Sequence, residues 1–347
     1  MRRLRSRGGK GAVWEVFDRY DDILNSKGKT NMGEASERPS VPTLAEVQNY
    51  LRVNRNWGRW GADDERGTAN LITDECRVRA AQLIRSGRSI SLSRPIDAVP
   101  GVDNTQPVQY HIMVGNRPHG AGYAGDYFGI SCHGHTTTHI DALCHIWDDD
   151  GIYNDRSPDQ VIGFGGANFG GAQAWADGIT GRGVLIDVPR HRGTSYVTQA
   201  NPVHGWELDE IVKQHHVELE PGDIVCVYSG REAFERDHPD QPYGRWKNVD
   251  GEIEKPGLHA SCLWFLRQHD VGALVWDMMD LMPHGYDVAW TVHGSIHSFG
   301  LILIDNALLE TLAEICASEN RDTFFFTCAP MLMERSTGSI ANPVAIL

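Results

Sequence analysis

From residue 183 onward, short apolar segments rich in β-branched residues alternate with segments of helical period, and this alternation restricts the fold more than any other feature. Five segments have the length and composition of buried strands, at 183–188, 223–228, 271–276, 301–304 and 323–328. Three segments between them are expected to be helical, at 207–216, 257–269 and 307–318. Strands that alternate with helices are typical of a sheet covered by helices. We therefore predict an α/β fold.

The first half of the chain has different signals. Thr43 and Glu46 have the spacing of a capping box, which predicts a helix to about Val53. Thr73 can cap a second helix over 74–86. Alternation of apolar and polar residues then predicts three antiparallel strands, at 89–96, 107–114 and 122–131.

No internal repeat or low-complexity linker divides the chain after its N-terminal part. We predict an N-terminal extension, residues 1–41, and a single domain, residues 42–347. The extension is basic at its start but lacks the apolar segment of a secretory signal. We expect it to be peripheral to any active site.

Composition restricts the class of partner and the compartment. The formal net charge of −14 argues against a nucleic-acid surface. No apolar run reaches the roughly 20 residues of a membrane-spanning helix, so we expect no membrane partner. The seven cysteines are odd in number and form no Cys-x-x-Cys pair, which indicates reduced thiols and a cytoplasmic protein.

The segment from Ser131 to His145, SCHGHTTTHIDALCH, concentrates residues that bind metals. Four of the 16 histidines lie in its last thirteen residues, together with one aspartate. An extended chain would direct the odd-numbered side chains to one face, and these include His135, His139, Asp141 and His145. Imidazoles with a carboxylate are usual ligands of zinc, manganese or iron. The segment therefore predicts a metal site.

Neither a regular helix nor a straight strand would bring these side chains to one ion. In a helix, Asp141 would lie about 200° further round than His139. In a straight strand, His135 and His139 would be roughly 13 Å apart. Ligands of one metal each lie only about 2 Å from it. We therefore expect the segment to bend, as a strand that runs into a turn.

The segment resembles the signature of the cyclase family of metal-dependent hydrolases, which includes bacterial kynurenine formamidases and isatin hydrolase. That signature is His-x-Gly-Thr-His-x-Asp-x-x-x-His, and residues 135–145 match its four functional positions. Thr137 replaces the usual glycine, and Leu143 replaces a common proline. The resemblance extends from about Asn56 to the C-terminus. It implies a swivelling β/β/α domain with a mixed sheet, which assembles as a homodimer or homotetramer.

The resemblance also implies a second pair of site residues. In the family a later histidine is followed twelve residues on by a glutamate, both near the metal. His293 and Asp305 keep this spacing, with a shorter carboxylate. His293 would stabilise an oxyanion or assist proton transfer, and Asp305 would orient it or contact a second metal. Two other interpretations stay open, namely a core position for His293 and a helix N-cap for Asp305.

These residues together suggest roles. His135, His139 and Asp141 would hold Zn²⁺ or Mn²⁺ with one position open to water. His145 would be the general base and would later protonate the leaving group. We expect hydrolysis of an amide, formamide, lactam or lactone. The ten tryptophans are compatible with an aromatic or cyclic small-molecule substrate, and equally with core packing.

Other classes of function could use some of the same residues. His139, Asp141 and His293 have the form of the triad of non-haem Fe(II) oxygenases. That function would leave His135 and His145 without a role, and it would require an all-β barrel. A metal-binding module without catalysis is a third possibility. A serine hydrolase is disfavoured, because the chain has no Gly-x-Ser-x-Gly turn.

Overall fold

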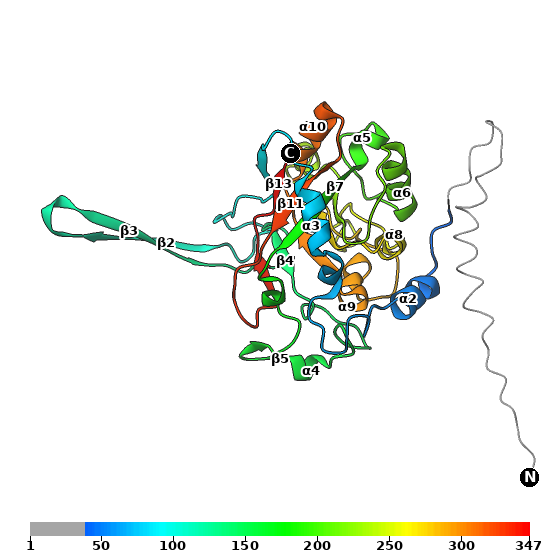
Figure 1. Ribbon diagram of the computed structural model, residues 1–347, viewed down its shortest axis with the longest axis horizontal. Helices are drawn as coiled ribbons and strands as arrows, with labels where there is room; N and C mark the ends of the chain where they lie inside the picture. The colour runs from blue at the N-terminus through cyan, green and yellow to red at the C-terminus, as the bar shows by residue number, and fades with distance from the viewer. Residues whose placement is uncertain (1–38) are drawn as a thin grey trace, which may run out of the picture. The chain divides into compact units, whose positions relative to one another are not determined.

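A nine-stranded mixed sheet runs through the centre of the structure, a computed structural model that describes residues 39–347 (Figure 1). The strands follow the order β1 (Ser89–Ser91), β13 (Val344–Ile346), β11 (Thr323–Cys328), β7 (Ile179–Asp187), β8 (Ile224–Tyr228), β9 (Ala273–Trp276), β10 (Ile302–Asp305), β4 (His139–Asp141) and β12 (Gly338–Ile340). Strands β7, β8, β9 and β10 are parallel, and antiparallel strands continue the sheet on both sides. The predicted α/β class and mixed sheet are confirmed.

Helical segments connect the parallel strands, because each connection must cross from the end of one strand to the start of the next. The helices after β7 are α5 (Val188–Arg192) and α6 (Gly205–Gln214); those after β8 are α7 (Arg231–Asp237) and α8 (Cys262–Gln268); those after β9 are η5 (Val292–Gly294) and α9 (Ser295–Phe299); and α10 (Glu310–Glu319) follows β10. Every residue of β8, β9 and β10 is buried, because helices and loops cover both faces of the sheet.

The N-terminal helices follow the predicted caps. In α2 (Leu44–Val53), Thr43 and Glu46 form both hydrogen bonds of the capping box. In α3 (Asp74–Ala81), Thr73 caps the first turn, but the helix ends five residues before the predicted boundary. The short remaining elements are η2 (Gly67–Leu71), η3 (Pro118–Gly120), α4 (Pro158–Val161), β5 (Ile162–Gly163), β6 (Gly166–Ala167) and η4 (Ala172–Trp175).

Several boundaries differ from the sequence-based expectation. The helix expected over 257–269 begins only at Cys262, because Leu258 is bridged to Val203 and Asp280 in an extended conformation. Strand β10 reaches Asp305, one residue beyond the predicted end, so this carboxylate belongs to the sheet. Residues 39–41 are the only part of the expected extension 1–41 that the structure describes. From Val41 to Leu347 the chain forms one compact unit.

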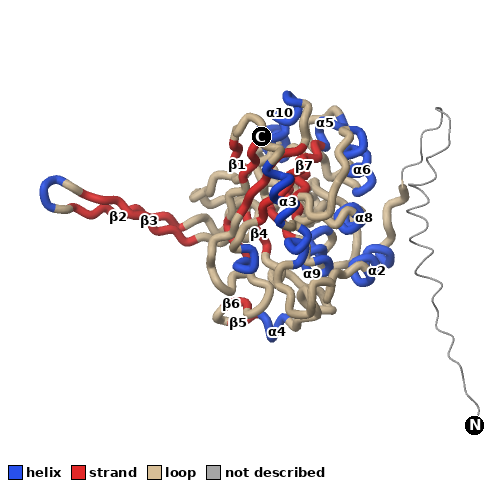
Figure 2. Tube along the Cα trace, viewed as in Figure 1, coloured by secondary structure: helices blue, strands red, loops and turns tan. Residues whose placement is uncertain are grey.

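Strands β2 (Gln109–Asn116) and β3 (Gly122–Gly129) form an antiparallel hairpin that extends away from the sheet (Figures 1 and 2). Nearly every residue of the hairpin is exposed. Its exposed apolar and aromatic side chains are Tyr110, Ile112, Met113, Val114, Tyr123, Tyr127 and Phe128. An isolated two-stranded hairpin is marginally stable in water.

Among residues 39–347, no helix combines the length and the apolar character needed to cross a membrane. All seven cysteines lie in this range, and all are free thiols.

Candidate metal centre

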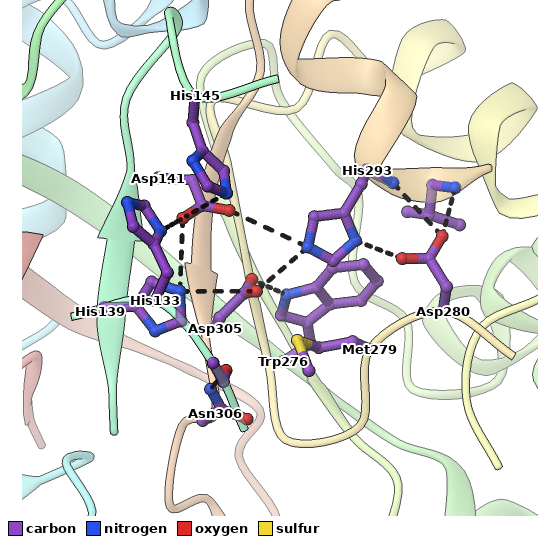
Figure 3. A network of polar contacts seen from close by, with 12 residues as sticks. His133, His139, Asp141, His145, Trp276, Met279, Asp280, His293, Asp305 and Asn306 are labelled. Carbon is purple, nitrogen blue, oxygen red and sulfur yellow. Dashed lines mark hydrogen bonds and ion pairs between the residues drawn. The ribbon is translucent and has the colours of Figure 1, made fainter. Parts of the chain in front are cut away.

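Two neighbouring antiparallel strands place the first site residues. In β4, His139 and Asp141 share one face, while Ile140 between them is completely buried on the other. Asp305, at the end of β10, lies directly opposite His139. Directly opposed residues of an antiparallel pair project to the same face, so all three polar side chains meet there (Figure 3).

Asp141 is the centre of the cluster. Its carboxylate lies 2.9 Å from His133 Nδ1 and 3.3 Å from His139 Nε2. His145 Nε2 and His293 Nε2 are further away, at 3.8 and 3.9 Å. The carboxylate is only 1% exposed. A buried carboxylate surrounded by four imidazoles is poorly explained by packing and is typical of a metal site.

The tautomer of His139 suits a ligand. Its Nδ1 lies 2.8 Å from the carbonyl oxygen of Thr137 and must carry the proton that this acceptor receives. Nε2 therefore presents a lone pair toward Asp141 and Asp305. A backbone hydrogen bond to the remote ring nitrogen is the usual support of a metal-binding histidine.

His293 is held between two aspartates. Its Nδ1 makes a very short contact with Asp280, and its Nε2 lies 3.1 Å from Asp305 Oδ2. Asp280 also accepts hydrogen bonds from the Thr291 hydroxyl and the Val292 amide. The other oxygen of Asp305 accepts from Trp276 Nε1 at 2.5 Å. Figure 3 shows this chain of contacts from Asp280 through His293 to Asp305 and Asp141.

Two groups of described residues could each hold an ion, with ligand atoms that all lie within 4.8 Å of one another. The first contains His133, His139 and Asp141, and the second contains Asp141, His293 and Asp305. Asp141 belongs to both. The donor set of imidazoles and carboxylates fits zinc or manganese.

The electrostatics of the cluster also fit a cation. Burial opposes the charged form of His133, yet its hydrogen bond to Asp141 raises the pKa of the imidazole to about 10. Burial likewise opposes ionisation of Asp141, but the neighbouring His145 and His139 hold its pKa well below the usual value. The carboxylate thus attracts positive charge, and a divalent ion would replace the protons that the imidazoles otherwise carry.

The predicted residues are brought together with one difference. His139, Asp141, Asp305, His293 and His145 all line one cavity, as does His135. His135 belongs to neither ligand group; its ring packs against Gly244, where a Cβ atom would lie 2.0 Å from the imidazole. Its Nδ1 is buried and has no hydrogen-bond partner among the described residues. The expected bend is present, since only residues 139–141 of the segment are in a strand.

Residues that the sequence did not single out support the segment before β4. Asn306, which follows β10 with a φ of 55°, donates to the carbonyl oxygens of Gly134 and Thr137. Arg231 donates to the carbonyl oxygen of His135 at 2.6 Å. Gly338 leaves space for His133, because a Cβ there would lie 2.5 Å from the imidazole. His133 also has an odd number, so the alternation argument could have included it among the candidate ligands.

The structure also decides between interpretations that the sequence left open. Asp305 is no helix cap, because α10 starts later and its N-cap position is Leu309. His293 is on the cavity wall and not in the apolar core. The α/β fold disagrees with the barrel that the oxygenase interpretation requires.

The cavity beside the cluster has a volume of about 300 Å³. The further lining residues that matter for chemistry are Lys255, Asp280, His284, Trp290 and Thr291. Burial lowers the pKa of His145 to about 4, so its imidazole is neutral at pH 7 and can accept a proton.

Comparison with known proteins gives a consistent result. A family model described as putative cyclase matches residues 90–281. A crystal structure of a novel cyclase has 27% sequence identity and a TM-score of 0.72, and the match covers 84% of this chain and 99% of that one. No curated protein matches the sequence.

Two isatin hydrolase structures share the fold at lower identity. One, bound to the product analogue thioisatinate, has a TM-score of 0.53 and 14% identity over 75% of this chain and 92% of its own. The other, isatin hydrolase A from Labrenzia aggregata bound to benzyl benzoate, has a TM-score of 0.52 and 16% identity, with 74% and 93% covered.

Proposed function

Because the chain belongs to the putative cyclase family, we propose that it is a metal-dependent hydrolase that cleaves an amide, formamide, lactam or lactone. The observation that carries the proposal is the buried cluster around Asp141, which borders a cavity and has a neutral imidazole, His145, at its edge. Structural likeness to isatin hydrolases supports the fold. The scissile bond is inferred from the chemistry of the site.

We assign the ligands from the donor geometry. His139 and Asp141 are common to the sequence motif and the first ligand group, and Asp305, from the second group, lies 3.9 Å from His139 Nε2. The geometry favours His133 over His135 as the next imidazole, because His133 contacts Asp141 and His135 does not. A bound Zn²⁺ or Mn²⁺ would supply Lewis-acid chemistry, polarising a carbonyl and lowering the pKa of water.

The protein's own groups then divide the proton transfers. His145, with its side chain 27% exposed, can reach both the cavity and water, so we assign it as the general base. Burial opposes protonation of His293, but the charge of Asp280 raises its pKa well above the usual value. A protonated His293 would stabilise negative charge that develops on a substrate oxygen.

Metal analysis combined with a hydrolysis screen tests the proposal. The purified chain should contain a stoichiometric transition metal, and the loaded protein should hydrolyse at least one compound in a set of formamides, lactams and lactones. Metal without hydrolysis of any of them would favour a binding module. Turnover that requires O₂ and 2-oxoglutarate would instead identify an oxygenase.

We also propose that the chain forms homo-oligomers through the β2–β3 hairpin. Both faces of the hairpin carry exposed apolar groups, for example Ile112 on one face and Met113 on the other. Among the Asp, Glu, Lys and Arg residues, strands β2 and β3 contain only Asp126, whose carboxylate accepts a hydrogen bond from the Tyr110 hydroxyl. Exposed apolar patches of this kind are typical of protein interfaces. β3 also leads directly toward His133, so a bound partner would steady the segment that carries the cluster.

A further inference from the structure

Lys255 is a buried cation on the wall of the cavity. The residue is only 7% exposed, and it lines the same cavity as the metal cluster. Its backbone is fixed, because its N–H donates to the carbonyl oxygen of Met282 at 2.9 Å and its own carbonyl oxygen accepts from Met282 N–H at 3.1 Å. Its Nζ lies over the Tyr243 ring, 5.5 Å from the centroid. The backbone at Lys255 is therefore fixed, and its side chain extends past Tyr243.

No described residue forms an ion pair or a hydrogen bond with Lys255 Nζ. Arg231 also lies over the Tyr243 ring, with its Cζ 4.3 Å from the centroid, but unlike Lys255 it has partners. Its guanidinium donates to Glu235, Asn306 and the carbonyl oxygen of His135. Lys255 Nζ is not among the fully buried polar atoms, so it reaches the open space of the cavity, where a ligand can bind it. The missing partner of Lys255 is thus best sought in a ligand.

The acidic groups of the cavity are already engaged by other donors. Asp280 accepts from Thr291, Val292 and His293, and Asp305 accepts from Trp276 and contacts His293. Neither comes within ion-pair distance of Lys255, although both are on the same cavity wall.

We propose that the cavity accepts a substrate bearing a carboxylate, and that Lys255 binds this group. The inference rests on the proposed hydrolase function and names the class of substrate within it. A single ammonium matches the charge of a monoanion such as a carboxylate. The volume of about 300 Å³ lies at the small end of ligand sites and suits a compact acid.

A matched pair of substrates tests the assignment. N-Formylanthranilate and formanilide share the formamide and the ring and differ by one carboxylate. In the metal-loaded wild type, N-formylanthranilate should have the higher kcat/KM. Lys255→Met keeps the apolar stem and removes the charge, so it should raise KM for N-formylanthranilate roughly 10- to 100-fold, the effect of a charged hydrogen bond. Its kcat/KM for formanilide should fall by a much smaller factor than that for N-formylanthranilate. Lys255→Arg should retain the preference for the acid.

Matched controls separate the result from misfolding. Lys213 is exposed on α6, and Lys213→Met should leave both substrates unaffected. Lys255→Gln serves as a second uncharged variant if the methionine variant does not fold. An equal loss for the two compounds, or no loss for either, in a folded uncharged variant would overturn the proposal.

A binding measurement stands apart from catalysis. Benzoate titrated into the metal-loaded protein should bind at least tenfold more weakly to Lys255→Met than to wild type, whereas benzyl alcohol should bind both equally. If neither formamide is hydrolysed, the proposed function fails for this bond type, and the benzoate result still decides the role of Lys255. Equal binding of benzoate to both proteins, or none to wild type, would contradict the carboxylate assignment.

Discussion

His139 and Asp305 face each other across two antiparallel strands, and His139 Nε2 lies 3.9 Å from Asp305 Oδ2. Both side chains are at most 3% exposed, and the gap is too long for a hydrogen bond. The lone pair of His139 Nε2 and the Asp305 oxygen are thus close enough to bind the same cation without being bonded to each other. The register of β4 and β10 therefore builds part of the ligand set from segments far apart in the sequence.

Asp141 should be indispensable for metal binding, because it belongs to both ligand groups. Asp141→Ala should reduce the metal content from about one ion per chain to nearly none, since one ligand and the charge that attracts the ion are lost together. Elemental analysis of the purified variant measures this. The exposed Asp240→Ala is the control and should keep its metal. Full metal content in Asp141→Ala would rule out this centre.

The structure and the sequence motif favour different histidines as the first imidazole ligand, His133 and His135 respectively. If His133, His139 and Asp141 hold the ion, His133→Ala should lower metal affinity by at least ~10-fold, as expected when a ligand or its direct support is lost. His135→Ala should retain the metal, because its ring lies outside both groups. Competition with a chelator gives the two affinities. The reverse order would restore the ligand assignment that the motif predicts, with His135 as the ligand.

His145→Ala should separate metal binding from proton transfer. Its Nε2 is 3.8 Å from Asp141, further than His133 or His139, so the metal should remain. The value of kcat should fall by at least ~10²-fold, the usual effect of removing a general base. Metal content and steady-state rates on the same preparation provide the check. A variant that loses metal but regains full activity on reloading would show that His145 is not the base.

The sequence predicted most of the site because the motif is local. His139, Asp141 and His145 lie within seven residues, and the requirement for a bend followed from the distance between metal ligands. The choice between His133 and His135 could not be made in this way. It depends on Arg231, Asn306 and other distant groups that fix the path of the segment before β4.

The fold was predictable where strands are buried and connected by helices. The alternation after residue 183 predicted the five strands β7 to β11, although not their pairing or their order in the sheet. Strands β12 and β13 were missed because each has only three residues, too few to show a period of two. Asp280 and Lys255 were missed for another reason, since their importance arises from burial in a common cavity.

The hairpin should control oligomeric state. Ile112→Asp and Phe128→Asp each place a charge on one face of the hairpin, whose residues contact little else in the chain. Each variant should shift the assembly toward monomer in light scattering coupled to size-exclusion chromatography. The exposed Asp240→Ala again serves as the control. An unchanged mass for both hairpin variants would place the interface elsewhere.

His259 should make the stability of the fold depend on pH. The Ser261 N–H donates to His259 Nδ1 at 3.1 Å, and Tyr286 directs its hydroxyl proton to the carbonyl oxygen of Pro42. The Tyr286 oxygen is thus left to accept from His259 Nε2, 3.1 Å away, and the ring is neutral. A second ring proton would displace the Ser261 N–H from Nδ1, where Ser261 Oγ also lies 3.1 Å away. Burial, with the charge of His204 as a smaller cause, lowers the pKa of His259 to about 4.

Between pH 6.5 and 4 the unfolded chain therefore binds a proton at this residue that the folded chain excludes. The contribution to stability is complete above pH 6.5 and decreases as the pH falls to 4, by roughly 3 kcal/mol in total. In His259→Gln, the free energy of unfolding from urea titrations should fall less steeply over this range than in wild type. The exposed His216→Asn, outside the hairpin, should follow the wild-type curve. If His259→Gln follows it as well, His259 is protonated in the fold and its hydrogen-bond assignment is wrong.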